Sequence, residues 1–409
     1  MLISVTLLAL IIANSPLARA YDDLLHTYMS VSLGSFVLRE TVLHWINDGL
    51  MALFFFVVGL ELKREALVGE LADFRRAALP IAAALGGALL PALFYIVVNR
   101  GSAGSVGWGV PMATDIAFAL GVLALVGDRV PWTLKVFLTA VAVIDDLLAV
   151  LVIAVFYSAG VNVAALGVGF GVLLLLFALN VVGIRNTLVY VALGVIVWVA
   201  FLQSGIHATI AGVLVAMTIP ARRRIDEAGF IQRVRTLMAH FEEGGSGSAR
   251  MLTNDQQQHA VLELEEACEA VQAPLQKLEH VLHPWVAFAI VPVFALANAG
   301  VPLSVSGISG PGLLVIVGIM LGLVAGKPLG LVGMSWLLVR LGVTTLPEGV
   351  RWAHIVGVGC LAGLGFTMSL FIATLGFGES ELLEAAKLGI LGASLLSGVL
   401  GFILLRRVQ

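Results

Sequence analysis

Apolar positions dominate the chain in long runs, and short polar or charged segments separate these runs. A run of roughly 20 apolar residues is long enough for an α-helix to cross a bilayer. Taking charged residues, glycine and proline as boundaries, the pattern predicts about twelve membrane-spanning helices. The expected spans are residues 2–18, 43–66, 77–99, 108–127, 131–157, 161–182, 186–203, 205–220, 280–300, 312–338, 352–377 and 384–405. We therefore expect an all-α integral membrane protein with a single transmembrane domain over residues 1–409.

Composition agrees with this pattern. Hydrophobic residues make up 60% of the chain and charged residues only 12%, with a mean hydropathy of +1.04. A soluble domain is about half apolar and about a quarter charged, so this chain has too little polar surface for a soluble enzyme. The sequence shows no basic stripe for nucleic acid and no nucleotide-binding loop of the GxxxxGK[ST] type, which argues against an ATP-driven pump.

The first apolar run allows two interpretations. Residues 1–13 are followed by the small-residue sequence 18–20, an arrangement typical of a secretory signal peptide. However, no basic residue precedes the apolar run, as a signal peptide requires. We expect a short first membrane span instead.

The positions of lysine and arginine predict the orientation. If the N-terminus is cytoplasmic and the spans alternate, the outer loops carry only Arg19, Arg39, Arg100 and Lys387 of the 23 basic residues. Lys327 lies within a span, and all the others fall on the inner side, as the positive-inside rule predicts. The excess remains when residues 221–279 are left out, because long loops obey the rule poorly. Both termini are therefore expected in the cytoplasm.

Two segments outside the spans have a pattern of their own. Within residues 28–39, two short alternating runs flank Gly34 and Ser35, which predicts an outer β-hairpin whose edge could pair with a second copy. A flexible loop is the alternative. The long polar segment 221–279 contains a Gly/Ser linker at 244–248 and an acidic helical run at 262–271. We expect a cytoplasmic insertion with a solvated helix; a regulatory role is the alternative.

Ionisable residues inside the expected spans need an explanation, because a charge at the bilayer centre costs at least about 2.5–3.5 kcal/mol. The candidates are Asp48, Asp115, Asp145, Asp146, His207 and Lys327. Asp145 and Asp146 are adjacent, so on a helix they point about 100° apart and cannot easily share one partner. A structural ion pair is one explanation and an ion-binding site is the other. Lys327 is the only base in a span, and we expect a buried aspartate as its partner.

Asp115 follows Thr114 in a span that Gly109 and Pro111 weaken. A broken helix exposes carbonyl groups, which at membrane depth are tolerated where they line a cavity or meet other protein. Those carbonyls, a hydroxyl and carboxylates would form an all-oxygen site suited to a hard cation such as sodium. A proline kink without a ligand role is the alternative. The span at 352–377 has a similar weak point, made by Gly357, Gly359, Gly363 and Gly365, with Thr367 after them.

The expected chemistry is exchange. Burial in the membrane favours the neutral form of a carboxyl group, so such a group can hold a proton near neutral pH. Sodium competes for the deprotonated form. A site that holds either ion, and faces each side in turn, exchanges one for the other without a cofactor. If one sodium displaces more than one proton, the membrane potential drives the cycle. A sodium-coupled symporter for organic anions and a cation channel are the alternatives.

Eight stretches of the chain, in order, resemble the NhaA family of bacterial sodium/proton antiporters. They are residues 45–54, 59–65, 113–121, 144–147, 204–209, 279–285, 326–330 and 365–369. The resemblance extends from about residue 2 to residue 405. It implies a bacterial inner-membrane protein with inverted-topology repeats and two discontinuous helices that cross. It also implies lithium as a second substrate, activation at alkaline pH, and a homodimer bridged by the outer hairpin.

The resemblance also implies roles for individual residues. Asp146 matches the aspartate that binds sodium and carries the proton, and Asp145 matches its neighbour, which pairs with Lys327. Asp115 and Thr114 match the aspartate and threonine at the helix crossing, so sodium is expected at Asp146 and Asp115. Asp48 matches an acid near the outer part of the ion pathway. The residues that match those associated with pH sensing are Glu61, Arg64, Glu65, His207, Glu279, His280 and His283. The residues alone leave open which of Asp145 and Asp146 binds the ion.

Two departures from the family limit these expectations. Segment 221–279 is much longer than in the most familiar member, so cytoplasmic pH control can differ. The N-terminus is short and lacks the usual polar lead-in, so we expect a shorter first span.

Overall fold

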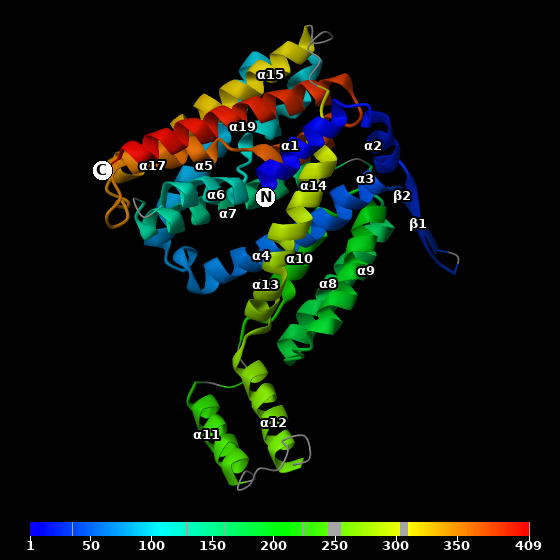
Figure 1. The fold of residues 1–409 in the computed structure, drawn as a ribbon, viewed down its shortest axis with the longest axis vertical. Coiled ribbons are helices and arrows are strands. Elements are labelled where there is room, and N and C mark those ends of the chain that lie inside the picture. The colour runs from blue at the N-terminus through cyan, green and yellow to red at the C-terminus, as the bar shows by residue number, and fades with distance from the viewer. Residues whose placement is uncertain are drawn as a thin grey trace.

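Long apolar helices form most of the computed structural model, which describes residues 1–34, 36–127, 130–158, 160–222, 225, 227–243, 255–302 and 310–408. Eight helical segments within these ranges are long and apolar enough to cross a membrane. They are Val42–Val68, Phe74–Val98 (α5), Trp132–Phe156 (α7), Val163–Val182 (α8), Thr187–Ser204 (α9), Pro274–Asn298, Pro311–Arg340 and Glu381–Arg407 (α19). At one end of the bundle, α19 packs against α15 (Pro311–Leu321) and α17 (Trp352–Ala362), as Figure 1 shows.

Three of these segments are subdivided by a wider helical turn, the π-helix. The first consists of α3 (Val42–His44), the π-turn η1 (Trp45–Leu50) and α4 (Met51–Val68). The other two are divided in the same way, into α13 (Pro274–Trp285), η6 (Val286–Ile290) and α14 (Val291–Asn298), and into α15 (Pro311–Leu321), η8 (Gly322–Gly326) and α16 (Lys327–Arg340). Such turns often mark functional positions. Asp48 lies within η1, and Lys327 follows η8 directly.

In three further pairs of helices, the two members together are long and apolar enough to cross a membrane, but the pair bends by more than 40° at a short break. They are α1 and α2 (Leu2–Ala13 and Ala18–Leu25, 110°), η3 and α6 (Ala103–Met112 and Ile116–Val126, 45°), and α17 and α18 (Trp352–Ala362 and Phe366–Phe377, 43°). η3 is a 3₁₀ helix that contains Gly107, Gly109 and Pro111. The glycine and proline residues seen in the sequence therefore coincide with real interruptions.

Length and composition do not confirm the exact number of spans that the sequence pattern suggested. Length and composition give eight spans among the described residues, or eleven if each bent pair counts as one. The expected span 205–220 is the clearest difference, because α10 (Thr209–Thr218) has only ten residues. At 1.5 Å per residue it covers about 15 Å, half of the hydrocarbon core. The expected first span, 2–18, ends early because the chain turns after α1.

α1 is part of the folded bundle. It packs against α14, and the Asn14 side chain donates a hydrogen bond to the Val301 carbonyl at 2.8 Å. The first apolar run thus behaves as a bundle helix in this structure.

An antiparallel hairpin confirms the prediction for residues 28–39. β1 (Tyr28–Leu33) pairs with β2 (Phe36–Thr41), and Leu33 stands opposite Phe36. The hairpin projects from the bundle beside α9 (Figure 1). Trp45 ties it to η1, because its indole nitrogen donates to the Met29 carbonyl at 3.2 Å.

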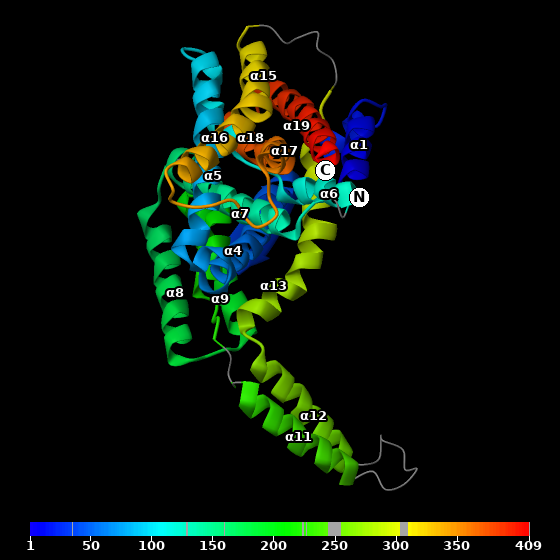
Figure 2. The same ribbon diagram turned by 90° about the vertical axis from the view of Figure 1, so that its left-hand side faces the viewer.

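Among its described residues, segment 221–279 contains two complete helices, where one was expected, and the start of α13. α11 (Glu227–Glu243) packs against α12 (Asp255–Val271), and together they project well beyond the bundle (Figures 1 and 2). The acidic run at 262–271 lies in α12. The Gly/Ser linker at 244–248 lies outside the described residues. η2 (Glu70–Ala72) is a single 3₁₀ turn between α4 and α5.

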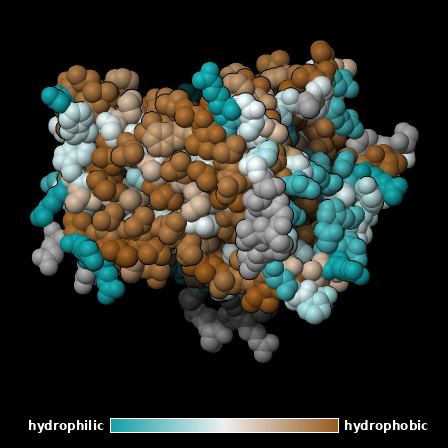
Figure 3. Space-filling view, turned by 90° about the horizontal axis from the view of Figure 1, so that it is seen from above, coloured by the Kyte–Doolittle hydropathy of each residue, from teal (hydrophilic) through white to brown (hydrophobic). Residues whose placement is uncertain are grey.

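The outer surface of the bundle is apolar. Seen from above, a broad hydrophobic area is bordered by hydrophilic residues on two sides (Figure 3). Leu174, Leu188 and Leu395 are examples of exposed large side chains on α8, α9 and α19. An apolar surface of this extent is stable against lipid, not water.

Close helix contact positions the residues of the interior. α5 and α16 touch through Gly86 and Gly330, and a Cβ atom added to either glycine would lie within 2.2 Å of the other's carbonyl oxygen. Small residues allow helices in membranes to approach in this way. The contact sets Lys327 beside Gly87, and from there its side chain extends into the centre of the bundle.

Candidate ion-binding site

α7 is the most buried of the eight long apolar segments, because 72% of its most apolar 18-residue stretch is buried. Asp145 and Asp146 lie near its middle, and each is 2% exposed. The surrounding positions, from Val141 to Ile144, are buried and apolar. Two acids at the centre of such a helix depend on their immediate neighbours for stabilisation.

Lys327 neutralises one of the two acids. Its Nζ lies 2.7 Å from Asp145 Oδ2, and neither side chain has any solvent exposure. Thr114 donates its hydroxyl hydrogen to the same oxygen at 2.7 Å. Lys327 also donates to the Met112 carbonyl. Asp145 therefore has a cation and a hydroxyl group on one carboxylate oxygen, while its Oδ1 has no hydrogen-bond partner within the described part of the chain.

Asp115 lies where the two interrupted helices meet. Its backbone nitrogen donates to the Leu364 carbonyl at 2.6 Å. The Thr114 hydroxyl oxygen lies 3.0 Å from the Ala362 carbonyl oxygen, so this carbonyl and Asp145 Oδ2 share its one hydrogen. The connection between η3 and α6 therefore contacts the connection between α17 and α18. These segments are about 250 residues apart in the chain.

The Asp115 carboxylate accepts hydrogen bonds from the start of two helices. Oδ1 accepts from the Phe118 backbone nitrogen at 3.1 Å, in the first turn of α6. Oδ2 accepts from the Thr367 backbone nitrogen at 3.0 Å and from the Thr367 hydroxyl, in the first turn of α18. Helix N-termini carry unpaired N–H groups and partial positive charge, so a carboxylate there is stabilised.

The opposite helix ends face positive or donating groups. The Met112 carbonyl, the last of η3, accepts from the Lys327 ammonium group. The Ala362 carbonyl, the last of α17, shares the one hydroxyl hydrogen of Thr114 with Asp145. Carbonyl ends carry partial negative charge. Each broken helix is thus compensated at both ends of its break, by an acid on one side and by a donor on the other.

Asp146 differs from both other acids because its carboxylate makes no ion pair or hydrogen bond with the residues that the structure describes. Its Oδ1 is buried without a donor, as is Asp145 Oδ1, but Asp145 also has Lys327 and Thr114 on its other oxygen. The carboxylates of Asp145, Asp115 and Glu61 are close enough to act on it electrostatically. A buried acceptor without a donor is rare and calls for a functional explanation.

The resemblance implies two sodium ligands, Asp146 and Asp115. These two carboxylates differ in their hydrogen bonding. Both oxygens of Asp115 already accept hydrogen bonds from helix termini, whereas Asp146 Oδ1 accepts none. Within the described ranges, no group of three or more His, Cys, Asp or Glu side chains is arranged to hold a metal ion.

Asp48 lies apart from the central acids, in the π-turn η1. Its Oδ2 is 2.9 Å from His44 Nε2, and its side chain is 11% exposed. The Trp198 indole nitrogen donates to its backbone carbonyl at 3.3 Å. Beside it, Asn298 donates to the Asn47 side-chain oxygen at 2.8 Å, which links η1 to α14.

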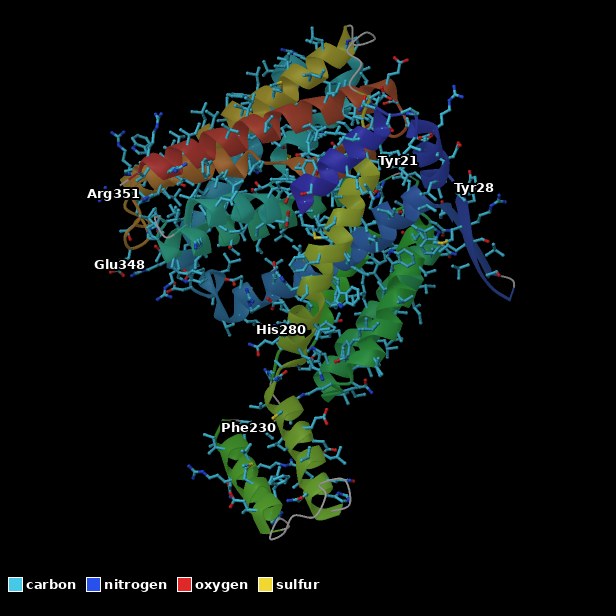
Figure 4. All side chains as sticks on the ribbon, in the orientation of Figure 1. Tyr21, Tyr28, Phe230, His280, Glu348 and Arg351 are labelled. Carbon is cyan, nitrogen blue, oxygen red and sulfur yellow. The ribbon has the colours of Figure 1, made fainter. Side chains whose placement is uncertain are left out.

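A second ionic cluster joins the end of α4 to α13. Arg64 pairs with Glu279, and its other terminal nitrogen lies 3.0 Å from Glu65 Oε1. Glu61 interacts electrostatically with all three of these residues. Arg64, Glu279, His280 and His283 line a cleft of about 660 Å³. Figure 4 shows His280 on the lower part of α13, on the side from which α11 and α12 project.

His207 is not part of that cluster. It lies in the loop before α10, and its Nε2 is 2.9 Å from the Tyr157 carbonyl oxygen. Lys63, next to Arg64, donates instead to the Ile219 carbonyl at 2.6 Å, just after α10 ends. The histidine and the cluster therefore lie at opposite ends of α10.

Sequence reasoning did not assign a site role to Thr367 or to the carbonyls of Met112 and Leu364. The signal available for Thr367 was its position two residues after Gly365, at the weak point of its span. The carbonyl contacts have no sequence signal, because every residue has a carbonyl group.

Comparison with known proteins gives the family of this arrangement. The family model described as Na⁺/H⁺ antiporter 1 matches residues 1–405. The chain belongs to this family. It is 50% identical over 406 residues to the Na⁺/H⁺ antiporter NhaA of Oleidesulfovibrio alaskensis, covering 99% of this chain and 90% of that protein. NhaA of Koribacter versatilis is 46% identical over 410 residues (100% and 88% covered), and NhaA of Wolinella succinogenes is 48% identical over 397 residues (96% and 87% covered).

Membership of the Na⁺/H⁺ antiporter family agrees with the resemblance found in the sequence. Together with the apolar helices, it makes the chain a multi-pass membrane protein. The family assignment concerns the whole chain, since the matched region includes α11 and α12.

Proposed function

We propose that this protein exchanges cytoplasmic sodium ions for external protons across a bacterial inner membrane, as a secondary transporter without enzymatic chemistry. The relatives' names supply the two ions that are exchanged, Na⁺ and H⁺. The observation that carries the proposal for the site is that Asp146, whose buried Oδ1 has no donor, lacks among the described residues the ion pair and the hydroxyl bond that hold Asp145. Asp146 is the proposed carrier, and it holds either a proton or a sodium ion.

The surrounding contacts support this division of roles. Lys327 and Thr114 hold Asp145, so a cation that approached that carboxylate would compete with an ammonium group 2.7 Å away. Asp115 is held at two helix N-termini and contributes negative potential near Asp146. A sodium ion at Asp146 Oδ1 would lie in the field of several carboxylates. A proton on Asp146 would remove the negative charge that attracts the ion.

The two interruptions supply the proposed moving part. Their contacts are hydrogen bonds between helix ends, such as Asp115 nitrogen to the Leu364 carbonyl, which can exchange partners without loss of a packed core. Interrupted helices that meet near the midplane are typical of transporters with inverted-topology repeats. We assign η3–α6 and α17–α18 to the two discontinuous, crossing spans of such a pair, within a bundle of about twelve spans whose termini are both cytoplasmic.

The remaining features of the proposal are regulatory. Exchange is electrogenic, accepts lithium as well as sodium, and is activated at alkaline pH. The ionic cluster of Glu61, Arg64, Glu65 and Glu279 with the nearby His280 and His283 is the proposed cytoplasmic pH sensor; His207, at the other end of α10, modulates it. Asp48 lies on the proposed outer ion pathway. The β1–β2 hairpin is the proposed bridge of a homodimer.

Everted membrane vesicles with an imposed pH gradient test the proposal directly. Addition of sodium at pH 7 to 9 should collapse the gradient in vesicles that contain the native protein. Asp146→Asn should abolish this response, because the amide neither binds sodium as an anion nor carries the proton. Glu263→Gln removes an exposed acid from α12 and should leave the response intact.

Two outcomes would contradict the proposal. Full sodium-dependent collapse in Asp146→Asn would remove Asp146 from the carrier role. Absence of collapse with sodium or lithium in the native protein at any pH would reject antiport, and uptake of labelled organic anions driven by sodium would then test the symporter alternative.

A further inference from the structure

A groove of about 960 Å³ lies at the end of the bundle where α5 and α7 begin. The start of α5, the start of α7 and the loop 342–348 form its walls. Two hydrogen bonds fix the loop against the helices: the Thr133 hydroxyl donates to the Glu348 carbonyl at 2.8 Å, and the Thr344 hydroxyl donates to the Arg75 carbonyl at 3.4 Å. The groove is therefore built from three ordered segments. The central acids do not line it, and its lining on α7 ends at Ala140.

Four charged side chains line this groove, two of each sign. They are Arg75 and Arg76 on α5, Glu70 before it, and Glu348 on the loop. None of the four has an ion-pair partner within 4 Å in the described part of the chain. Figure 4 places Glu348 at the tip of the loop, at the edge of the bundle. Opposite charges that share a cavity without pairing are available to a ligand that carries both charges.

The N-terminus of a helix also lines the groove. α7, which has 25 residues, begins at Trp132 and has no side-chain cap. The first N–H groups of an uncapped helix, together with the helix dipole, favour a phosphate group. Arginine adds donors whose planar geometry matches phosphate oxygens.

The rim of the groove is suited to lipid. Trp132 is 74% exposed, and Phe74, at the start of α5, is 79% exposed. Aromatic residues at the ends of membrane spans lie at headgroup level. A ligand in the groove could therefore keep its acyl chains in the membrane while its headgroup occupies the polar interior.

We propose that this groove binds a phospholipid whose headgroup carries both a phosphate and a primary ammonium group. Arg75, Arg76 and the first N–H groups of α7 hold the phosphate. Glu70 and Glu348 hold the ammonium group, which donates up to three hydrogen bonds. A choline headgroup cannot donate these bonds, and a glycerol headgroup has no positive charge for the carboxylates. The lipid would join the start of α5, the start of α7 and the loop.

Native mass spectrometry of the purified protein, titrated with phosphatidylethanolamine, phosphatidylcholine or phosphatidylglycerol, tests this proposal. The ethanolamine lipid should bind with the highest affinity. Arg75→Gln with Arg76→Gln should weaken its binding about tenfold or more, since two charge-assisted contacts are lost. Arg100→Gln, which removes an exposed arginine at the opposite end of α5, should not change it.

A second variant tests the ammonium half of the site. Glu70→Gln with Glu348→Gln should remove the preference for phosphatidylethanolamine over phosphatidylcholine while phosphate-dependent binding remains. Equal affinity of the native protein for all three lipids would overturn the proposal. Unchanged ethanolamine-lipid binding in the arginine variant would also overturn it. Thermal unfolding of each variant without added lipid separates loss of the site from loss of the fold.

Discussion

Replacement of Lys327 by methionine is the sharpest test of how the interior is held together. Lys327 and Asp145 are both fully buried, and their charged atoms are 2.7 Å apart. Removal of one partner of such a pair leaves an uncompensated buried charge and costs about 3–5 kcal/mol. Lys327→Met also leaves the Met112 carbonyl, at the end of η3, without its donor. We expect a loss near the upper part of that range, measured by unfolding of the purified protein in mixed micelles with increasing denaturing detergent.

A double-mutant cycle separates the ion pair from loss of packing. Asp145→Asn combined with Lys327→Met removes both charges, so the double variant should be more stable than Lys327→Met alone. Lys387→Met is the matched control, because Lys387 also lies in an apolar helix but is only half-buried, and it should cost less than about 1 kcal/mol. If Lys327→Met were as stable as the native protein, or if the double variant were less stable than the single one, the pair would not have the stabilising role inferred from its geometry.

Two further changes use the same unfolding measurement. Gly86→Ala places a Cβ atom 2.2 Å from the Gly330 carbonyl oxygen and should destabilise the α5–α16 contact by about 1–3 kcal/mol. In the control Gly87→Ala, the added Cβ meets its nearest atoms at 3.7 Å, so this change should be close to neutral. Equal effects of the two changes would reject the close-contact explanation. Thr367→Val removes a hydroxyl donor from the Asp115 carboxylate and should cost about 1.5–3 kcal/mol. Thr374→Val, whose hydroxyl donates only to a carbonyl of its own helix, should cost less, and a larger loss there would contradict the assignment.

Much of the fold follows from local patterns in the sequence. Apolar runs identify the spans because every backbone polar group in lipid must be paired within a helix. Gly109 and Pro111 mark the break after η3, and Gly363 and Gly365 mark the break after α17. The number of spans is less predictable, because a run such as 205–220 can contain a helix of only ten residues. Apolar composition does not reveal where a helix begins.

The contacts between distant segments could not be predicted in the same way. The pattern predicted that Lys327 meets a buried aspartate but could not select Asp145 by itself, and it gave no partner for Asp115. Thr367, which binds Asp115, is 252 residues further along the chain. Gly330, which allows α16 to approach α5, is similarly far from Gly86. These pairs depend on how the two halves pack, and a single sequence does not encode that information in any local pattern.

The contacts bear on the question that adjacent acids leave open, namely which of them carries the ion. Neighbouring positions on α7 point about 100° apart, so one acid can face Lys327 only if the other faces elsewhere. Asp145 is the one that meets Lys327 and Thr114. A sodium ion at Asp145 would have to displace an ammonium group that also compensates the carbonyl end of η3, and would thereby disturb a helix break. Asp146 can gain or lose an ion without disturbing either contact, and this difference supports Asp146 as the carrier.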